Sequence, residues 1–144
     1  MKTLIAVAAT LLCAVSTMTG ASEPSIEVYK SPTCGCCGKW VKHLEANGFK
    51  VKAHDVDDVS VYKERFGVPV ALGACHTAKV GDYAIEGHVP AEDIKRLLKE
   101  RPKVKGIGVA GMPAGSPGME SPHPERYEVK SFDLDGALKT FAKH

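Results

Sequence analysis

The stretch at residues 26–49, IEVYKSPTCGCCGKWVKHLEANGF, decides the fold. Residues 26–29 alternate apolar and polar side chains, as a half-buried strand does. After a Ser-Pro turn, a helix is expected over about residues 34–46, with Trp40 on its apolar stripe. The Asn-Gly pair at residues 47–48 ends this helix, because both residue types tolerate the left-handed backbone of a helix C-terminus. The stretch therefore predicts a strand followed directly by a cysteine-bearing helix.

The next segments repeat this order. Residues 49–56 alternate again and predict a second strand, and a short helix is expected over residues 59–66, ending at Gly67. Strand, cysteine-bearing helix, strand and helix together are the opening of a thioredoxin-like domain. The Cys34-x-x-Cys37 pair then lies at a helix N-terminus, where the helix dipole and free N–H groups lower a thiol pKa.

A hairpin brings a further cysteine toward this helix. Residues 75–80 and 83–87 flank a Gly-Asp pair that suits a two-residue turn. Counting outward from the turn places Cys75 opposite His88, and opposed residues share a face of the sheet. His76 follows Cys75 directly and is expected to point to the other face. The register predicts Cys75 and His88 as neighbours at the open end of the hairpin, which in a thioredoxin-like topology lies beside the N-terminus of the first helix.

The rest of the chain completes one α/β domain. A helix is expected from Pro90-Ala91 to Glu100. Residues 101–124 are rich in glycine and proline, which predicts an ordered wrapping loop, containing two methionines, with no regular element. Residues 127–132 and 137–142 predict a terminal β-hairpin, with a final helix from Asp135 as the alternative. The expected fold is a thioredoxin-like mixed sheet with flanking helices.

Composition and the N-terminus limit the possible functions. The 144 residues carry 19 basic and 17 acidic side chains, a net charge of +2 with no basic run, which gives no reason to expect a nucleic-acid partner. Lys2, the apolar residues 4–15 and the small residues 19–21 predict a secretory signal peptide over residues 1–21, leaving one domain at 22–144. A membrane anchor is the alternative, but the apolar run is shorter than the roughly 20 residues of a span. Cys13 is expected to leave with the signal.

Four cysteines remain: Cys34, Cys36, Cys37 and Cys75. Three of them lie within four positions, where they cannot tie distant segments together. Cys34 and Cys37 could exchange disulfides, all four could bind a soft metal ion, or two could form an inert disulfide. Cys36 favours the metal, because a redox pair needs two thiols whereas Cu(I) gains from each further thiolate.

Other side chains suit the same ion. Met112 and Met119 lie in the glycine-rich loop, and thioether sulfur is a good ligand for Cu(I) and a poor one for zinc; alternatively, both fill gaps under the loop. His88 is a candidate ligand by register, and His76 a weaker one. A zinc ribbon would need a second Cys-x-x-Cys, which the sequence lacks.

Several segments in order resemble the CopG-type family of exported bacterial copper-resistance proteins. They are CGCC with the following Trp at residues 34–40, GVP at 67–69, CHTA at 75–78, IEGHVPA at 85–91, and GMP with GSPGME at 111–120. The resemblance implies a thioredoxin-like domain, a periplasmic location and copper handling through the cysteines.

The first hypothesis is therefore a periplasmic copper-binding protein for copper resistance, holding one or several copper ions, chiefly as Cu(I). Binding is favoured over enzymatic turnover, with Cu(I)/Cu(II) redox cycling left open. The expected ligands are Cys34, Cys36, Cys37, Cys75, His88, Met112 and Met119. The alternative is a thiol-disulfide oxidoreductase that uses Cys34 and Cys37 without metal. A third hypothesis is delivery of copper to an export pump or another periplasmic copper-handling protein.

Overall fold

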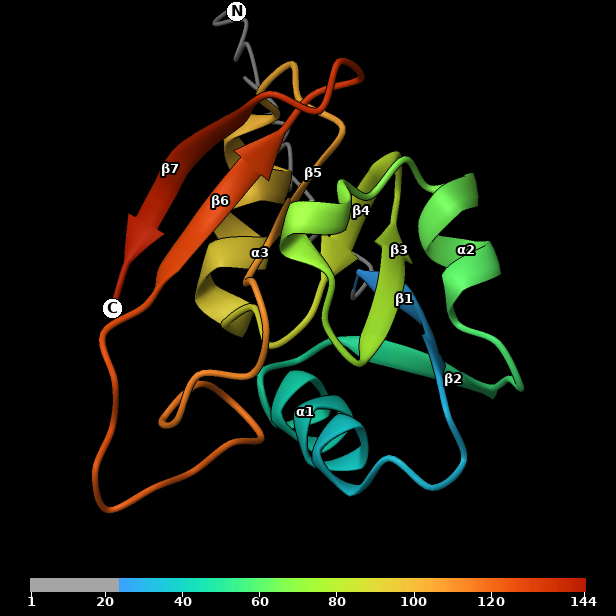
Figure 1. Cartoon of the computed structure of the whole chain (residues 1–144), viewed down its shortest axis with the longest axis vertical. Coiled ribbons are helices and arrows are strands. Elements are labelled where there is room, and N and C mark those ends of the chain that lie inside the picture. The colour runs from blue at the N-terminus through green and yellow to red at the C-terminus, as the bar shows by residue number, and fades with distance from the viewer. Residues whose placement is uncertain (1–23) are drawn as a thin grey trace, which may run out of the picture.

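The computed structural model describes residues 24–144, so the expected signal peptide and Cys13 lie outside the described residues. One seven-stranded mixed sheet has the order β2-β1-β3-β4-β5-β6-β7 (Figure 1). Its strands are β1 (Ser25–Lys30), β2 (Lys50–Asp55), β3 (His76–Val80), β4 (Tyr83–Glu86), β5 (Gly106–Gly108), β6 (Glu128–Phe132) and β7 (Leu138–Lys143). The helices are α1 (Gly35–Ala46), α2 (Ser60–Arg65), the 3-10 turn η1 (Val70–Leu72) and α3 (Ala91–Glu100). The predicted mixed α/β architecture with flanking helices is confirmed.

The strand pairings explain how distant segments meet. Strand β1 pairs in parallel with β2 and antiparallel with β3, which forms the predicted hairpin with β4. Strand β5 runs parallel to β4 and antiparallel to β6, and β6 pairs with β7. The terminal hairpin is thus confirmed, and the alternative of a final helix is wrong. No helix within residues 24–144 is long and apolar enough to cross a membrane.

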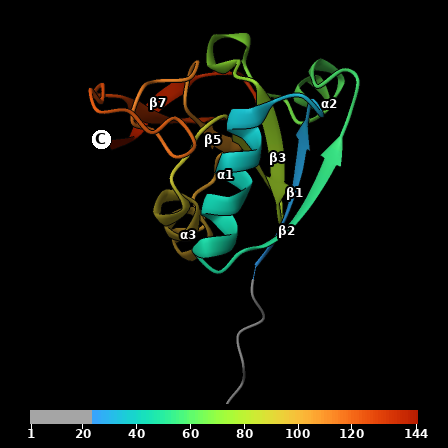
Figure 2. The ribbon, with the colours of Figure 1, turned by 90° about the horizontal axis from the view of Figure 1, so that it is seen from below.

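The core lies mainly between the sheet and helices α1 and α3. Trp40 and Leu44 of α1 and Ile94 and Leu97 of α3 are fully buried in one cluster with Ile85 of β4 and other inward-facing strand residues. Figure 2 shows α1 running alongside β1 and β3, with α3 next to it. A smaller cluster of Leu72, Ala84 and Phe132 lies on the opposite face of the sheet, because successive strand residues such as Ala84 and Ile85 point to opposite faces. This second face carries η1 and α2.

The β3–β4 hairpin has the predicted register. Val80 pairs with Tyr83 across the turn, and Ala78 pairs with Ile85. The pairing continues beyond the regular strands, since the Gly87 N–H donates to the His76 carbonyl at 3.2 Å. Cys75 and His88 therefore emerge side by side at the open end of the hairpin.

The segment at residues 101–124 contains one strand that the sequence did not predict. Strand β5 lies between β4 and β6, so the expectation of no regular element was wrong for these three residues. A Cβ atom on Gly106 would lie 2.1 Å from the Ala84 carbonyl oxygen and 2.7 Å from the Phe132 ring. The glycine that looked like a loop signal is thus required for close packing within a sheet. Residues 109–124 are irregular, as expected.

Candidate metal centre

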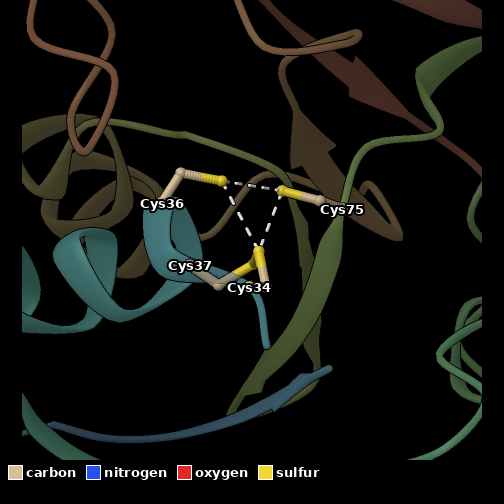
Figure 3. A group of neighbouring side chains, drawn as sticks. All are labelled: Cys34, Cys36, Cys37 and Cys75. Atoms are coloured by element: carbon tan, nitrogen blue, oxygen red, sulfur yellow. Dashed lines mark hydrogen bonds between the residues drawn. A yellow bond between two sulfur atoms is a disulfide. The ribbon is translucent and has the colours of Figure 1, made fainter. Parts of the chain in front are cut away.

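The four cysteine sulfurs come together from two distant segments. Cys34 is the N-cap residue of α1, Cys36 and Cys37 lie in its first turn, and Cys75 lies just before β3. All four Sγ atoms lie within 4.8 Å of one another (Figure 3). Cys75 Sγ is 3.6 Å from Cys36 Sγ and 3.5 Å from Cys37 Sγ, and Cys34 Sγ is 3.5 Å from Cys36 Sγ. The pairing of β3 with β1, the strand that leads into α1, thus places the fourth sulfur at the helix N-terminus.

Two of these sulfurs are joined. Cys34 and Cys37 form a disulfide, whereas Cys36 and Cys75 are free thiols. Cys37 is fully buried, and Cys34 is partly exposed. In this form the cluster offers two thiols beside a disulfide, and two-electron reduction would place four thiols in the same space.

Burial controls the protonation of the Cys75 thiol. It raises the pKa of Cys75 to about 12, with a further contribution from the neighbouring Cys36 thiol. The sulfur is therefore protonated at neutral pH in the metal-free protein. A soft cation that binds there has to displace this proton, so metal affinity is expected to rise with pH.

Two buried histidines each place an unprotonated ring nitrogen close to the Cys75 sulfur. His88 Nδ1 donates to the Pro117 carbonyl at 2.8 Å, which leaves Nε2, 3.4 Å from Cys75 Sγ, as the acceptor nitrogen. His76 Nε2 donates to the Gly87 carbonyl at 3.0 Å, which leaves Nδ1 at 3.5 Å from the same sulfur. Burial lowers the pKa of both imidazoles, that of His76 to about 3, so both are neutral and able to bind a metal.

The position of His76 corrects the sequence interpretation. Strand alternation predicted that His76 and Cys75 would point to opposite faces, but β3 begins at His76 and Cys75 lies outside it. The alternation rule therefore does not relate the two side chains. His76 is fully buried against Trp40, with ring centroids 4.4 Å apart, and shares the space next to the cluster with His88.

The glycine-rich loop closes over the first turn of α1. The Met112 sulfur lies 4.0 Å from Cys36 Sγ, and Met112 is half exposed. Gly118, with φ +88°, is buried so tightly that a Cβ atom would lie 2.8 Å from the Cys36 carbonyl oxygen and 2.9 Å from the Trp40 nitrogen. Met119 follows it, partly exposed, and its N–H donates to the Ser116 carbonyl at 2.8 Å. Among residues 24–144, the cysteine thiols make a sulfur–sulfur hydrogen bond to Met112 and none to Met119.

A buried ion pair behind Cys75 was not identified from the sequence. Lys63 of α2 bonds to Glu86 of β4, and Glu86 is fully buried. Burial raises the pKa of Glu86, and the Lys63 charge acts against that rise. The sequence offered one signal of this pair, a glutamate within an otherwise apolar hairpin strand. Nothing in the sequence indicated that its partner is Lys63, 23 residues earlier.

An α/β domain that groups four sulfurs and two neutral imidazoles at a helix N-terminus defines a candidate soft-metal protein. A family model described as "Protein of unknown function, DUF411" matches residues 72–119. Two solved structures of a copper resistance protein, CopG, are similar to this chain over most of its length. Form 1 is 46% identical with a TM-score of 0.80, covering 85% of this chain and 98% of that chain. Form 2 is 45% identical, also with a TM-score of 0.80, covering 84% and 98%. The chain belongs to the CopG family. A search of curated proteins found no match.

Proposed function

We propose that this protein binds copper, chiefly as Cu(I), and contributes to copper resistance in the periplasm. The proposed ligands are the thiolates of Cys34, Cys36, Cys37 and Cys75, supplemented by His88, Met112 and Met119. Support comes from membership of the CopG family, whose solved member is named for copper resistance. The signal-peptide pattern at residues 1–21 supports the location.

One observation carries this proposal: four cysteine sulfurs from two distant segments lie within 4.8 Å of one another. Thiolate sulfur is the ligand type that Cu(I) prefers, and thioether sulfur is also soft. A cluster with more sulfurs than a redox pair needs is suited to bridging, in which one thiolate binds two ions. The site can therefore hold more than one copper ion.

Binding through all four sulfurs requires the reduced chain. Reduction of the Cys34–Cys37 disulfide by a dithiol transfers two electrons and two protons to the cysteines and leaves the reductant as a disulfide. Each thiol that then binds Cu(I) as a thiolate releases its proton to solvent. The raised pKa of Cys75 makes this exchange at Cys75 dependent on pH.

The second candidate function is thiol-disulfide exchange without metal, and the disulfide itself favours it. Cys34 and Cys37 are already bonded at the N-terminus of a twelve-residue helix, and Cys34 is the more exposed sulfur. In that mechanism an incoming thiolate attacks Cys34 and releases Cys37. Cys36 would have no role in it.

The substitution Cys36→Ser separates the two functions. The chain from residue 22 is purified reduced and without oxygen, loaded with Cu(I), desalted, and assayed for copper per chain and for disulfide exchange with a dithiol. The copper proposal predicts that bound copper falls in the variant, because a bridging sulfur is lost. No copper in the wild type, together with undiminished exchange in the variant, contradicts the copper proposal and leaves the oxidoreductase.

A further inference from the structure

The Lys63–Glu86 ion pair holds the backbone on both sides of Cys75. Glu86 Oε1 accepts from the Ala74 N–H at 2.8 Å and also from Lys63 Nζ. The same Lys63 Nζ donates to the His76 carbonyl at 3.2 Å. One pair of side chains therefore binds the Gly73–Ala74 peptide group and the His76–Thr77 peptide group, one on each side of Cys75.

The backbone around Cys75 has few other hydrogen bonds. Residues 73–75 lie between η1 and β3 and belong to no helix or strand. Gly73 N–H donates to the Val70 carbonyl at 3.0 Å, and the Gly73 carbonyl accepts from Gly111 N–H at 3.4 Å. On the other side of Cys75, the His76 carbonyl accepts from Gly87 N–H at 3.2 Å. The shorter 2.8 Å bond to the Glu86 carboxylate is charge-assisted, and such bonds are roughly twice as strong as neutral ones.

Stability of the fold does not explain why this site carries an ion pair. The free-energy cost of removing two charges from water cancels most of the attraction between them. A protein with an apolar pair of similar volume at the same place is therefore often equally or more stable. The Glu86 side chain is fully buried and the Lys63 side chain mostly buried, so both charges are largely removed from water. A largely buried ion pair is a costly way to fill space, which favours a positional role.

We propose that Lys63 and Glu86 are positioning residues that fix Cys75 relative to Cys36 and Cys37, and so set the affinity of the cluster for a soft metal ion. The part concerning affinity rests on the proposed function. The geometric part does not, because it concerns where the Cys75 sulfur lies. Residues that orient metal ligands typically contribute about 10- to 100-fold to metal affinity.

The test compares two double variants with the wild type. Lys63→Met with Glu86→Leu removes both restraints with side chains of similar size. This variant is expected to weaken Cu(I) binding about 10- to 100-fold in a chelator competition. The urea concentration at the midpoint of its unfolding should be equal to that of the wild type or higher. Lys63→Met with Glu86→Gln keeps an oxygen that can accept from the Ala74 N–H, and is expected to recover part of the affinity.

A matched control lies on α3. Asp93 is also buried and pairs with Arg96 at 3.1 Å, but it makes no contact with the cysteine cluster among the described hydrogen bonds and ion pairs. Asp93→Asn is expected to lower stability while leaving Cu(I) affinity at the wild-type value. Equal loss of affinity in this variant would show that general loosening, and not the position of Cys75, explains the result.

Alkylation of Cys75 gives a second readout that needs no metal. In the metal-free, disulfide-containing chain, iodoacetamide labelling of Cys75, followed by mass spectrometry, should be faster in the Lys63→Met, Glu86→Leu variant than in the wild type. A Lys63→Met, Glu86→Leu variant that unfolds, or that folds with wild-type affinity and labelling rate, overturns the proposal. A wild type that binds no Cu(I) overturns the proposed function instead, and the labelling rates then still decide the positional role.

Discussion

Replacing Gly118 by alanine tests the contact between the glycine-rich loop and α1. With φ at +88°, any residue other than glycine is strained, at a cost of about 1–2 kcal/mol. The new Cβ would also lie 2.8 Å from the Cys36 carbonyl oxygen and 2.9 Å from the Trp40 backbone nitrogen. Both atoms belong to the backbone of α1, so they cannot move away as a flexible side chain could. Overpacking of this kind costs about 1–3 kcal/mol. The expected loss of unfolding free energy is therefore about 2–5 kcal/mol.

Gly48→Ala provides the matched control. Gly48 has φ +84°, and a Cβ there would meet nothing within 4 Å. It should therefore show the backbone cost of about 1–2 kcal/mol alone. Urea unfolding measures both variants, and Cu(I) competition should show weaker binding for Gly118→Ala only, because the displaced loop carries Met112 and the carbonyl that orients His88. Equal stability and equal affinity in the two variants would refute the claim that the loop is seated on α1.

Three further predictions address single side chains. Trp40→Phe leaves the Val89 carbonyl without the 2.9 Å bond from the indole N–H, and should lower the unfolding free energy by about 1–3 kcal/mol in urea titrations; an unchanged midpoint would contradict the role of this bond. His43 Nε2 accepts from the Ala91 N–H, and burial lowers the pKa of His43 below its ordinary value of 6.5. As pH falls below 6.5, the unfolded chain therefore binds a proton on His43 before the folded chain does. The contribution of His43 to the free energy of unfolding is complete above pH 6.5 and is lost as pH falls toward the folded-state pKa. His43→Gln should reduce the pH dependence of stability in that range, and an identical pH profile would contradict this role of His43. Met112→Leu should weaken Cu(I) binding without changing stability, since the side chain is half exposed; a variant with wild-type affinity would remove Met112 from the ligand set.

The sequence predicted local structure well where a short-range signal was sufficient. The alternation of β1, the extent of α1 and the Gly-Asp turn of the β3–β4 hairpin are all encoded within a few residues. Since a two-residue turn fixes the register of a hairpin, the amino-acid sequence alone places Cys75 opposite His88. The closeness of Cys75 to the other cysteines also depends on the pairing of β3 with β1, which the expected thioredoxin-like topology supplied.

The failures concern features that depend on distant partners. Strand β5 was missed because its glycines are required by close approach to β4 and β6, which local patterns do not contain. The side chain of His76 was predicted on the wrong face because strand alternation was applied to Cys75, one residue before the start of β3. The Lys63–Glu86 pair joins α2 to β4 through the tertiary fold, so the position of Glu86 in the hairpin strand did not indicate its partner.

Copper K-edge X-ray absorption on the reduced, Cu(I)-loaded chain tests the central claim most directly. If the four cysteines that lie within 4.8 Å of one another bind the metal, sulfur atoms should dominate the first coordination shell, and bridging thiolates should add a copper–copper signal when more than one ion is bound. In the quadruple serine variant of Cys34, Cys36, Cys37 and Cys75 the sulfur shell should be reduced to the thioether contribution. A wild-type spectrum with only nitrogen and oxygen ligands, or one that the four serines leave unchanged, would contradict the proposed copper site.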